Sequence, residues 1–182
     1  MPKIDSYVKE EIALLPKNEL VKLVIKAASK NKEFHDYLLV NYIDKAQGEK
    51  DLFEQARRDI EILFHKSYKG YSPELRLANM LAACNKRINE FAKVSKDKTL
   101  EMELILQVLE IPFSTAAECF GTCFTRFDQQ VYLLVKKAMT LLNKKLHEDY
   151  HIQYAPKINE YISSLHRTSD HLDYIYALPG KI

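Results

Sequence analysis

The sequence is poor in the residues that mark several common protein classes. Its 182 residues include only four glycines and three cysteines. So few glycines exclude a collagen-like chain, and no glycine-rich loop of the kind that cradles a nucleotide phosphate is found. The cysteines, Cys84, Cys119 and Cys123, are odd in number, so we expect no disulfide framework and a reducing compartment.

Long apolar runs and an excess of one charge are missing as well. Charged residues interrupt the first thirty positions and leave no apolar run long enough for a signal peptide. No later run approaches the roughly 20 residues of a membrane span. Lysine and arginine total 27 against 25 acidic residues, a balance that indicates neither nucleic acid nor an anionic membrane as partner. We therefore expect a soluble cytoplasmic protein.

Apolar residues at helical spacing recur along nearly the whole chain. No stretch alternates apolar and polar residues in the way that predicts a strand. The fold is therefore predicted to be all-α, as a single domain over residues 1–182. The helices, about eight or nine in number, are expected to form an irregular bundle or a short α–α superhelix.

Prolines and capping residues set the expected helix boundaries. Pro112 is predicted to end a central helix, after which Ser114 caps a helix to about Phe127. Asp128 is predicted to cap the longest helix, and Pro156 to open the one after it. Other residues suited to begin a helix are Asn31, Ser72, Asp97 and Ser169.

The opening of the chain has a distinctive layout. Tyr7-Val8-Lys9 is followed by Leu14-Leu15-Pro16-Lys17-Asn18-Glu19-Leu20 and then by Phe34-His35-Asp36-Tyr37-Leu38. With its leucines at helical spacing, it resembles the start of an uncharacterised family of small all-helical bacterial proteins, common in Bacteroidetes, over about the first 110 residues. The resemblance implies an all-helical fold without an established activity, and it assigns no catalytic residue.

The leading hypothesis is a non-enzymatic module for protein–protein contact that needs no cofactor. Its partner would be another protein or a second copy of the chain. Tyrosines are concentrated near the end of the chain, and their rings suit a rim that is half packed and half wet. Such a rim fits a partner surface or a terminal helix docked on its own domain. The predicted contact residues are Tyr154, Tyr161, Tyr174 and Tyr176.

One motif points to a different class, a zinc-dependent hydrolase. His147-Glu148-Asp149-Tyr150-His151 matches the H-E-x-x-H pattern of zinc metallopeptidases. On one helical face, His147 and His151 would bind zinc while Glu148 acts as general base. Both histidines, however, fall opposite the apolar stripe of the predicted helix, which favours a solvated helix end. A third ligand would have to be chosen among Glu160, His166, Asp170 and His171.

Two further patterns in the sequence suggest sites. Residues 66–98 contain eight basic and three acidic side chains. A nucleic-acid accessory acting through Lys86, Arg87 and Lys93 is therefore the second alternative, although these charges are spread around the predicted helix. Cys119 and Cys123 are four apart and would suit a metal or an oxidant, but their aromatic neighbours favour buried, unreactive thiols.

Overall fold

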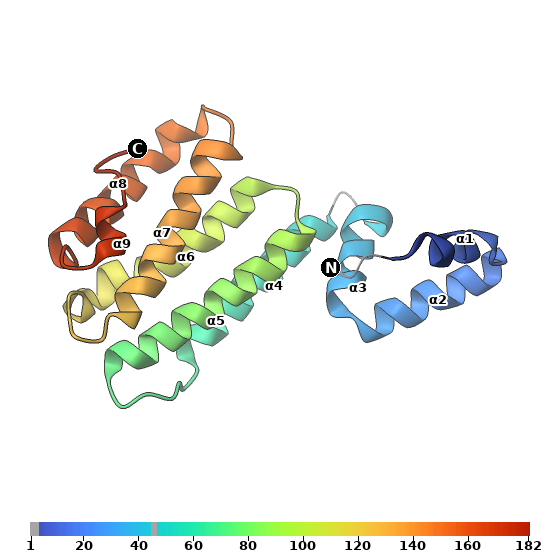
Figure 1. The fold of residues 1–182 in the computed structure, drawn as a ribbon, viewed down its shortest axis with the longest axis horizontal. Helices are drawn as coiled ribbons and strands as arrows, with labels where there is room; N and C mark the ends of the chain where they lie inside the picture. Colours follow the sequence, from blue (N-terminus) through green and yellow to red (C-terminus); the bar gives the residue numbers. More distant parts are fainter. Residues whose placement is uncertain (1–3, 45–46) are drawn as a thin grey trace. The chain divides into compact units, whose positions relative to one another are not determined.

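The computed structural model describes residues 4–44 and 47–182, and all regular structure in them is helical (Figure 1). The predicted all-α class is confirmed, with nine α-helices in the described residues. None of these helices combines the length and apolar character needed to cross a bilayer. The elements are α1 (Ser6–Leu14), α2 (Lys17–Lys30), α3 (Lys32–Leu38), the π-helical turn η1 (Leu39–Ile43), α4 (Gly48–His65), α5 (Pro73–Val94), α6 (Lys98–Thr115), the 3-10 turn η2 (Ala117–Cys119), α7 (Arg126–Lys144), α8 (Tyr150–Thr168) and α9 (Asp173–Tyr176).

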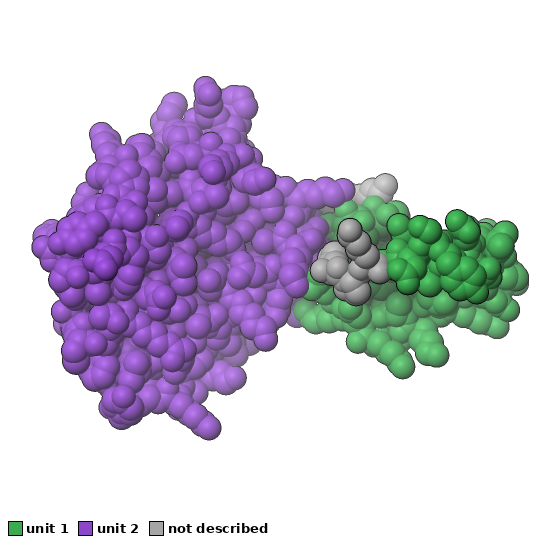
Figure 2. All heavy atoms as spheres, viewed as in Figure 1, with its two compact units in different colours: residues 1–48 green, residues 49–182 purple. Residues whose placement is uncertain are grey.

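The chain divides into two compact units, residues 1–48 and residues 49–182 (Figure 2). The sequence predicts a single domain over residues 1–182, because helical spacing continues on both sides of Gly48. The two units are distinguished by which helices pack together. α3 contacts α2 and η1, whereas α5, α6, α7 and α8 form a separate packed group. Periodicity alone does not say which stripes meet.

Residues 49–182 are built around α5, α6 and α7, which pack against one another. Each of these helices buries one or two apolar side chains per turn, and α8 packs against α7. Ser72 caps α5 by accepting a hydrogen bond from the N–H of Leu75, and Asp97 caps α6 through the N–H of Thr99. The largest fully buried side chains are Ile60, Leu81, Ile88, Phe91, Met102, Leu104, Ile105, Leu109, Phe127, Leu134, Leu142 and Ile158.

The predicted boundary at Pro112 is wrong. α6 continues through this proline to Thr115, and the helix expected over Ser114 to Phe127 is replaced by η2 and an irregular turn. Pro112 is buried, so packing compensates for the backbone hydrogen bond that proline cannot donate. The hydroxyl of Thr115 donates to the carbonyl of Ile111 at 3.0 Å in the last turn.

Two further boundaries differ from the prediction. Pro156 lies inside α8, which already begins at Tyr150. Asp128 does not cap α7, because the helix begins at Arg126 and Asp128 lies in its first turn. The fully buried Asp128 Oδ1 instead accepts hydrogen bonds from the N–H of Gly121 at 3.1 Å and from the hydroxyl of Ser169. Asp128 thus joins the turn before α7 to the end of α8.

Glu49, near the start of α4, holds the turn between α5 and α6. Its Oε1 accepts a hydrogen bond from Ser95 Oγ at 2.7 Å, and others from the N–H groups of Lys96 at 2.7 Å and Asp97 at 3.0 Å. Partial burial disfavours the charged form, but these hydrogen bonds outweigh it and lower the pKa of Glu49. The carboxylate therefore stabilises the turn mainly when it is ionised.

Replacing Glu49 with glutamine is expected to lower the free energy of unfolding by about 1 kcal/mol at neutral pH. Because the folded state lowers this pKa, the stabilisation is complete above about pH 4.5, the ordinary value, and disappears as the pH falls through the lower folded value. Urea unfolding followed by circular dichroism at several pH values tests this. Glu54→Gln, at an exposed position of the same helix, is the control. A difference that does not change with pH would contradict the role of the charge.

Candidate protein-contact surface

The helices of residues 1–48 bury almost no apolar surface. Among the described residues of this unit, Val40 is the only buried hydrophobic side chain. Asn31 caps α3 as predicted, by accepting a hydrogen bond from the N–H of Phe34 at 3.2 Å, so the helices themselves are well formed. Nevertheless α1, α2 and α3 contain no buried residue. A unit of this size without a core usually depends on other contacts.

Large apolar side chains are concentrated on the outside of this unit. They occur on both α1 and α2, where they are more exposed than is usual for isoleucine, leucine and valine. Such a concentration indicates a surface that contacts another molecule. The exposed large hydrophobic residues of the unit are Ile4, Tyr7, Val8, Ile12, Leu14, Val21, Leu23, Val24, Ile25, Tyr37, Tyr42 and Ile43.

On α1 the most exposed apolar residues form a stripe between acids. Tyr7 is 69% exposed and Leu14 is 78% exposed. Their spacing of seven residues places them on one face of the helix. Glu10 and Glu11 are three and four residues from each of them, so one carboxylate lies on either side of the stripe. We call Tyr7 and Leu14 with these two glutamates the acid-flanked stripe.

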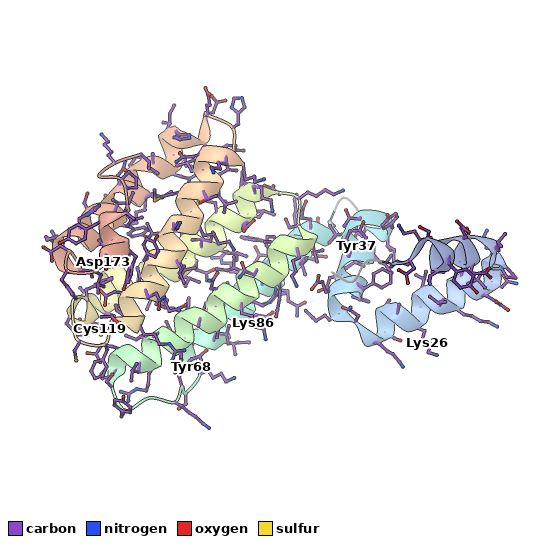
Figure 3. The ribbon with its side chains drawn as sticks, in the orientation of Figure 1. Lys26, Tyr37, Tyr68, Lys86, Cys119 and Asp173 are labelled. Atoms are coloured by element: carbon purple, nitrogen blue, oxygen red, sulfur yellow. The ribbon has the colours of Figure 1, made fainter. Side chains whose placement is uncertain are left out.

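On α2 a second stripe lies between lysines. Val21 is 48% exposed and Ile25 is 63% exposed, and a spacing of four residues places them on one face. Lys17 is four residues before Val21, and Lys22 is three residues before Ile25, so the two ammonium groups flank the stripe. We call these four residues the base-flanked stripe, and both stripes together the α1–α2 surface. Lys26, one turn further along α2, is labelled in Figure 3.

The flanking charges are not used to hold this unit together. Within residues 4–44 and 47–182, none of Glu10, Glu11, Lys17 and Lys22 forms an ion pair. Charges of both signs therefore surround apolar side chains without an ion-pair partner among the described residues. A polar rim around an apolar centre is the usual anatomy of a protein interface.

The predicted tyrosine surface is wrong at two of its four positions. Tyr154 and Tyr161 are buried, and Tyr161 stacks on Phe113 with ring centroids 4.3 Å apart. Burial raises the pKa of Tyr161 to about 12, with smaller effects from neighbouring glutamates. Tyr174 is half-buried and donates a hydrogen bond to the carbonyl of Thr125 at 3.1 Å. Only Tyr176 is well exposed, so these rings mainly dock α8 and α9 on their own unit.

The residues of the zinc hypothesis do not share a helical face. α7 ends at Lys144, so His147 lies in the turn that follows it, while His151 lies in the first turn of α8. His147 Nδ1 lies 3.1 Å from Asp149 Oδ2, and Glu148 is exposed. In the described part of the chain, no three His, Cys, Asp or Glu side chains are grouped to hold a metal. A zinc hydrolase stays a prediction that this geometry does not favour.

The basic segment 66–98 is divided between structure and solvent. Arg87 is buried and donates from Nε to Asp59 Oδ2 at 2.7 Å, which ties α5 to α4. Lys86 and Lys93 are exposed on α5, where Figure 3 labels Lys86. Lys98 Nζ lies 2.9 Å from a carboxylate oxygen of Glu101. With Arg87 paired inside the unit, the three basic residues predicted to contact nucleic acid do not act as one patch.

The cysteine pair is separated as well. Cys119, labelled in Figure 3, is buried on η2, whereas Cys123 is exposed in the turn before α7. The expectation that both are buried is thus wrong for Cys123, because the helix expected here does not form. Burial raises the pKa of Cys119, with smaller effects from Glu118 and other acids, and this disfavours the reactive thiolate form.

The α1–α2 surface was not among the residues that the sequence predicted as a site. Its leucines and valines have ordinary helical spacing and are typical of a core-facing stripe. The available signal is the width of the apolar arc on α2, where Val21 and Ile25 lie beside the stripe formed by Leu20, Leu23, Val24 and Ala27. One packing partner does not cover so wide an arc.

Comparisons with protein-family models, with curated proteins and with solved structures found no match to this chain. The resemblance of the opening residues to a bacterial family stays a prediction.

Proposed function

We propose that the protein is a non-enzymatic interaction module that binds a partner protein through the α1–α2 surface. The observation that carries the proposal is the exposure of Tyr7, Leu14, Val21 and Ile25 on a unit in which Val40 is the only described hydrophobic residue that is buried. Covering such side chains contributes about 25 cal/mol for each Å² removed from water, so a partner gains affinity here.

Residues 49–182 have a packed hydrophobic core, whereas the described residues of the first unit do not. This contrast supports the proposal that the second unit gives the chain its stability and the first unit binds the partner protein. We expect the contact to take place in the cytoplasm, because a reducing compartment suits a chain whose three cysteines are unpaired.

Replacing Leu14 and Ile25 together with lysine is expected to weaken partner binding at least about tenfold, because two desolvated apolar anchors become charged. The full chain, immobilised, is used to capture proteins from cells that express it, a second copy included. Lysine cross-linking with mass spectrometry then maps where the captured protein lies. We expect cross-links from Lys9, Lys17 or Lys22.

A matched control introduces two lysines at similarly exposed apolar positions outside the α1–α2 surface. Ile62 and Ile152 in the second unit are 67% and 86% exposed, similar to Leu14 and Ile25. The variant Ile62→Lys/Ile152→Lys should capture the same protein as the wild type. If the Leu14→Lys/Ile25→Lys variant retains its helicity by circular dichroism and still captures every protein that the wild type does, the proposed function is wrong.

A further inference from the structure

We infer that the partner of the α1–α2 surface is a second copy of this chain, joined so that the acid-flanked stripe of each copy lies on the base-flanked stripe of the other. This inference rests on the proposed function, since it names the partner of the same surface. It follows from the signs of the flanking charges and from the area of the apolar residues.

The charge pattern favours pairing between unlike stripes. In a two-fold dimer every contact occurs twice, so α1 on α2 of the partner also means α2 on α1. This arrangement brings Glu10 and Glu11 close to the partner's Lys17 and Lys22, around apolar side chains that meet in the centre. Pairing like stripes would place carboxylate against carboxylate or ammonium against ammonium, which is unfavourable. A second copy therefore supplies the complementary charge at both places.

The apolar area is sufficient for such a dimer. The four apolar residues of the two stripes, Tyr7, Leu14, Val21 and Ile25, present on the order of 500 Å² of exposed side-chain surface. A standard interface takes about 800 Å² from each partner, of which somewhat more than half is apolar, so the two stripes supply roughly the apolar share.

The first test is the mass of the purified full chain in solution. One chain has a mass of 21.2 kDa, and light scattering after size exclusion should give twice this value at protein concentrations of about 10 to 100 μM. Two charge-reversal variants, Glu10→Lys/Glu11→Lys and Lys17→Glu/Lys22→Glu, should each raise the dimer dissociation constant at least about tenfold. In each variant both stripes carry charge of one sign, so both contacts become repulsive.

Mixing the two variants separates a contact between copies from a contact within one chain. In the mixed dimer, the new lysines on α1 of the Glu10→Lys/Glu11→Lys copy face the new glutamates on α2 of its partner. The unchanged glutamates on α1 of that partner face the unchanged lysines on α2 of the first copy. Both contacts are then attractive, so the mixture should regain the dissociation constant of the wild type to within about threefold. If α1 and α2 paired only within their own chain, mixing would restore nothing.

Glu90→Lys/Glu148→Lys makes the same charge change as the first variant at exposed positions of residues 49–182, and it should remain dimeric. Circular dichroism checks that each variant is helical. A wild type that is monomeric throughout this range, a dimer that neither reversal weakens, or helical variants that do not recover on mixing would each overturn the second copy as partner. A monomer that still captures another protein through Leu14 and Ile25 would leave the proposed function standing, whereas loss of both results removes both.

Discussion

Replacing Glu101 with alanine is expected to lower the free energy of unfolding of the chain by about 2 to 3 kcal/mol. Glu101 is buried on α6, and its two carboxylate oxygens lie 2.9 Å from Lys98 Nζ and 3.0 Å from Lys137 Nζ. Lys137 also donates to Asn89 Oδ1 at 2.8 Å, which brings α5 into the same cluster. Removing the carboxylate leaves a largely buried ammonium group on α7 without its counter-ion.

The reason for this loss is the environment of the Lys137 ammonium group. Burial lowers the pKa of Lys137, and the charge and hydrogen bond of Glu101 oppose this effect. Without Glu101, burial and the nearby positive charge of Lys98 are left, and both disfavour the charged form of Lys137. A second replacement, Lys137→Met, removes that buried charge and should recover part of the stability that Glu101→Ala loses.

Urea unfolding followed by far-ultraviolet circular dichroism measures the effect, since the chain has no tryptophan for a fluorescence signal. Glu103→Ala, two residues away at an exposed position of α6, is the control and should change stability by less than about 0.5 kcal/mol. If Glu101→Ala is as stable as this control, or if Lys137→Met adds to its loss, the cluster does not stabilise the joint between α5, α6 and α7.

The parts of the fold that the sequence predicts well are those set by local chemistry. Asn31, Ser72 and Asp97 cap helices where their side chains are expected to accept backbone hydrogen bonds. Such caps depend on residues two or three positions away, so one stretch of sequence contains all of the information. The all-α class follows in the same way from spacing along the chain.

The parts that it predicts poorly depend on contacts distant in sequence. Pro112 is a local signal for a helix end, but its burial in the packed unit allows α6 to continue to Thr115. With α6 extended to Thr115, the segment before α7 forms η2 and an irregular turn, and Cys123 is exposed in this turn. The buried bond between Asp128 and Ser169 joins positions 41 residues apart. Capping rules do not anticipate a partner at that distance.

The candidate site was misplaced for a related reason. A stripe of leucine and valine looks the same in a sequence whether it faces a core or a partner, so spacing alone does not mark α1 and α2 as a site. Tyrosine, in contrast, suits both interfaces and docked terminal helices, and Tyr154 and Tyr161 are used in the second way. Only packing distinguishes the two cases, by showing which stripes remain uncovered.

Replacing Gly121 with alanine, which adds a single methyl group, is expected to lower the free energy of unfolding by about 3 kcal/mol. Gly121 has a φ of +69°, where a Cβ atom costs about 1 to 2 kcal/mol. A Cβ at this position would also overlap the carbonyl oxygen of Thr168 at the end of α8. To avoid the overlap, the turn must move away from α8 and lose the hydrogen bond between the Gly121 N–H and Asp128.

Thermal unfolding of Gly121→Ala beside Gly180→Ala separates this constraint from the general effect of removing a glycine. A Cβ at Gly180 has no heavy atom within 4 Å. The free energy of unfolding of Gly180→Ala should therefore lie within about 0.5 kcal/mol of the wild-type value. If the two alanine variants are equally stable, the close approach between the turn and α8 does not restrain the chain. A second outcome concerns the proposed dimer. If Gly121→Ala alone loses stability and still dimerises through the α1–α2 surface, the packing between the turn and α8 in the second unit does not affect the contact proposed for the first unit.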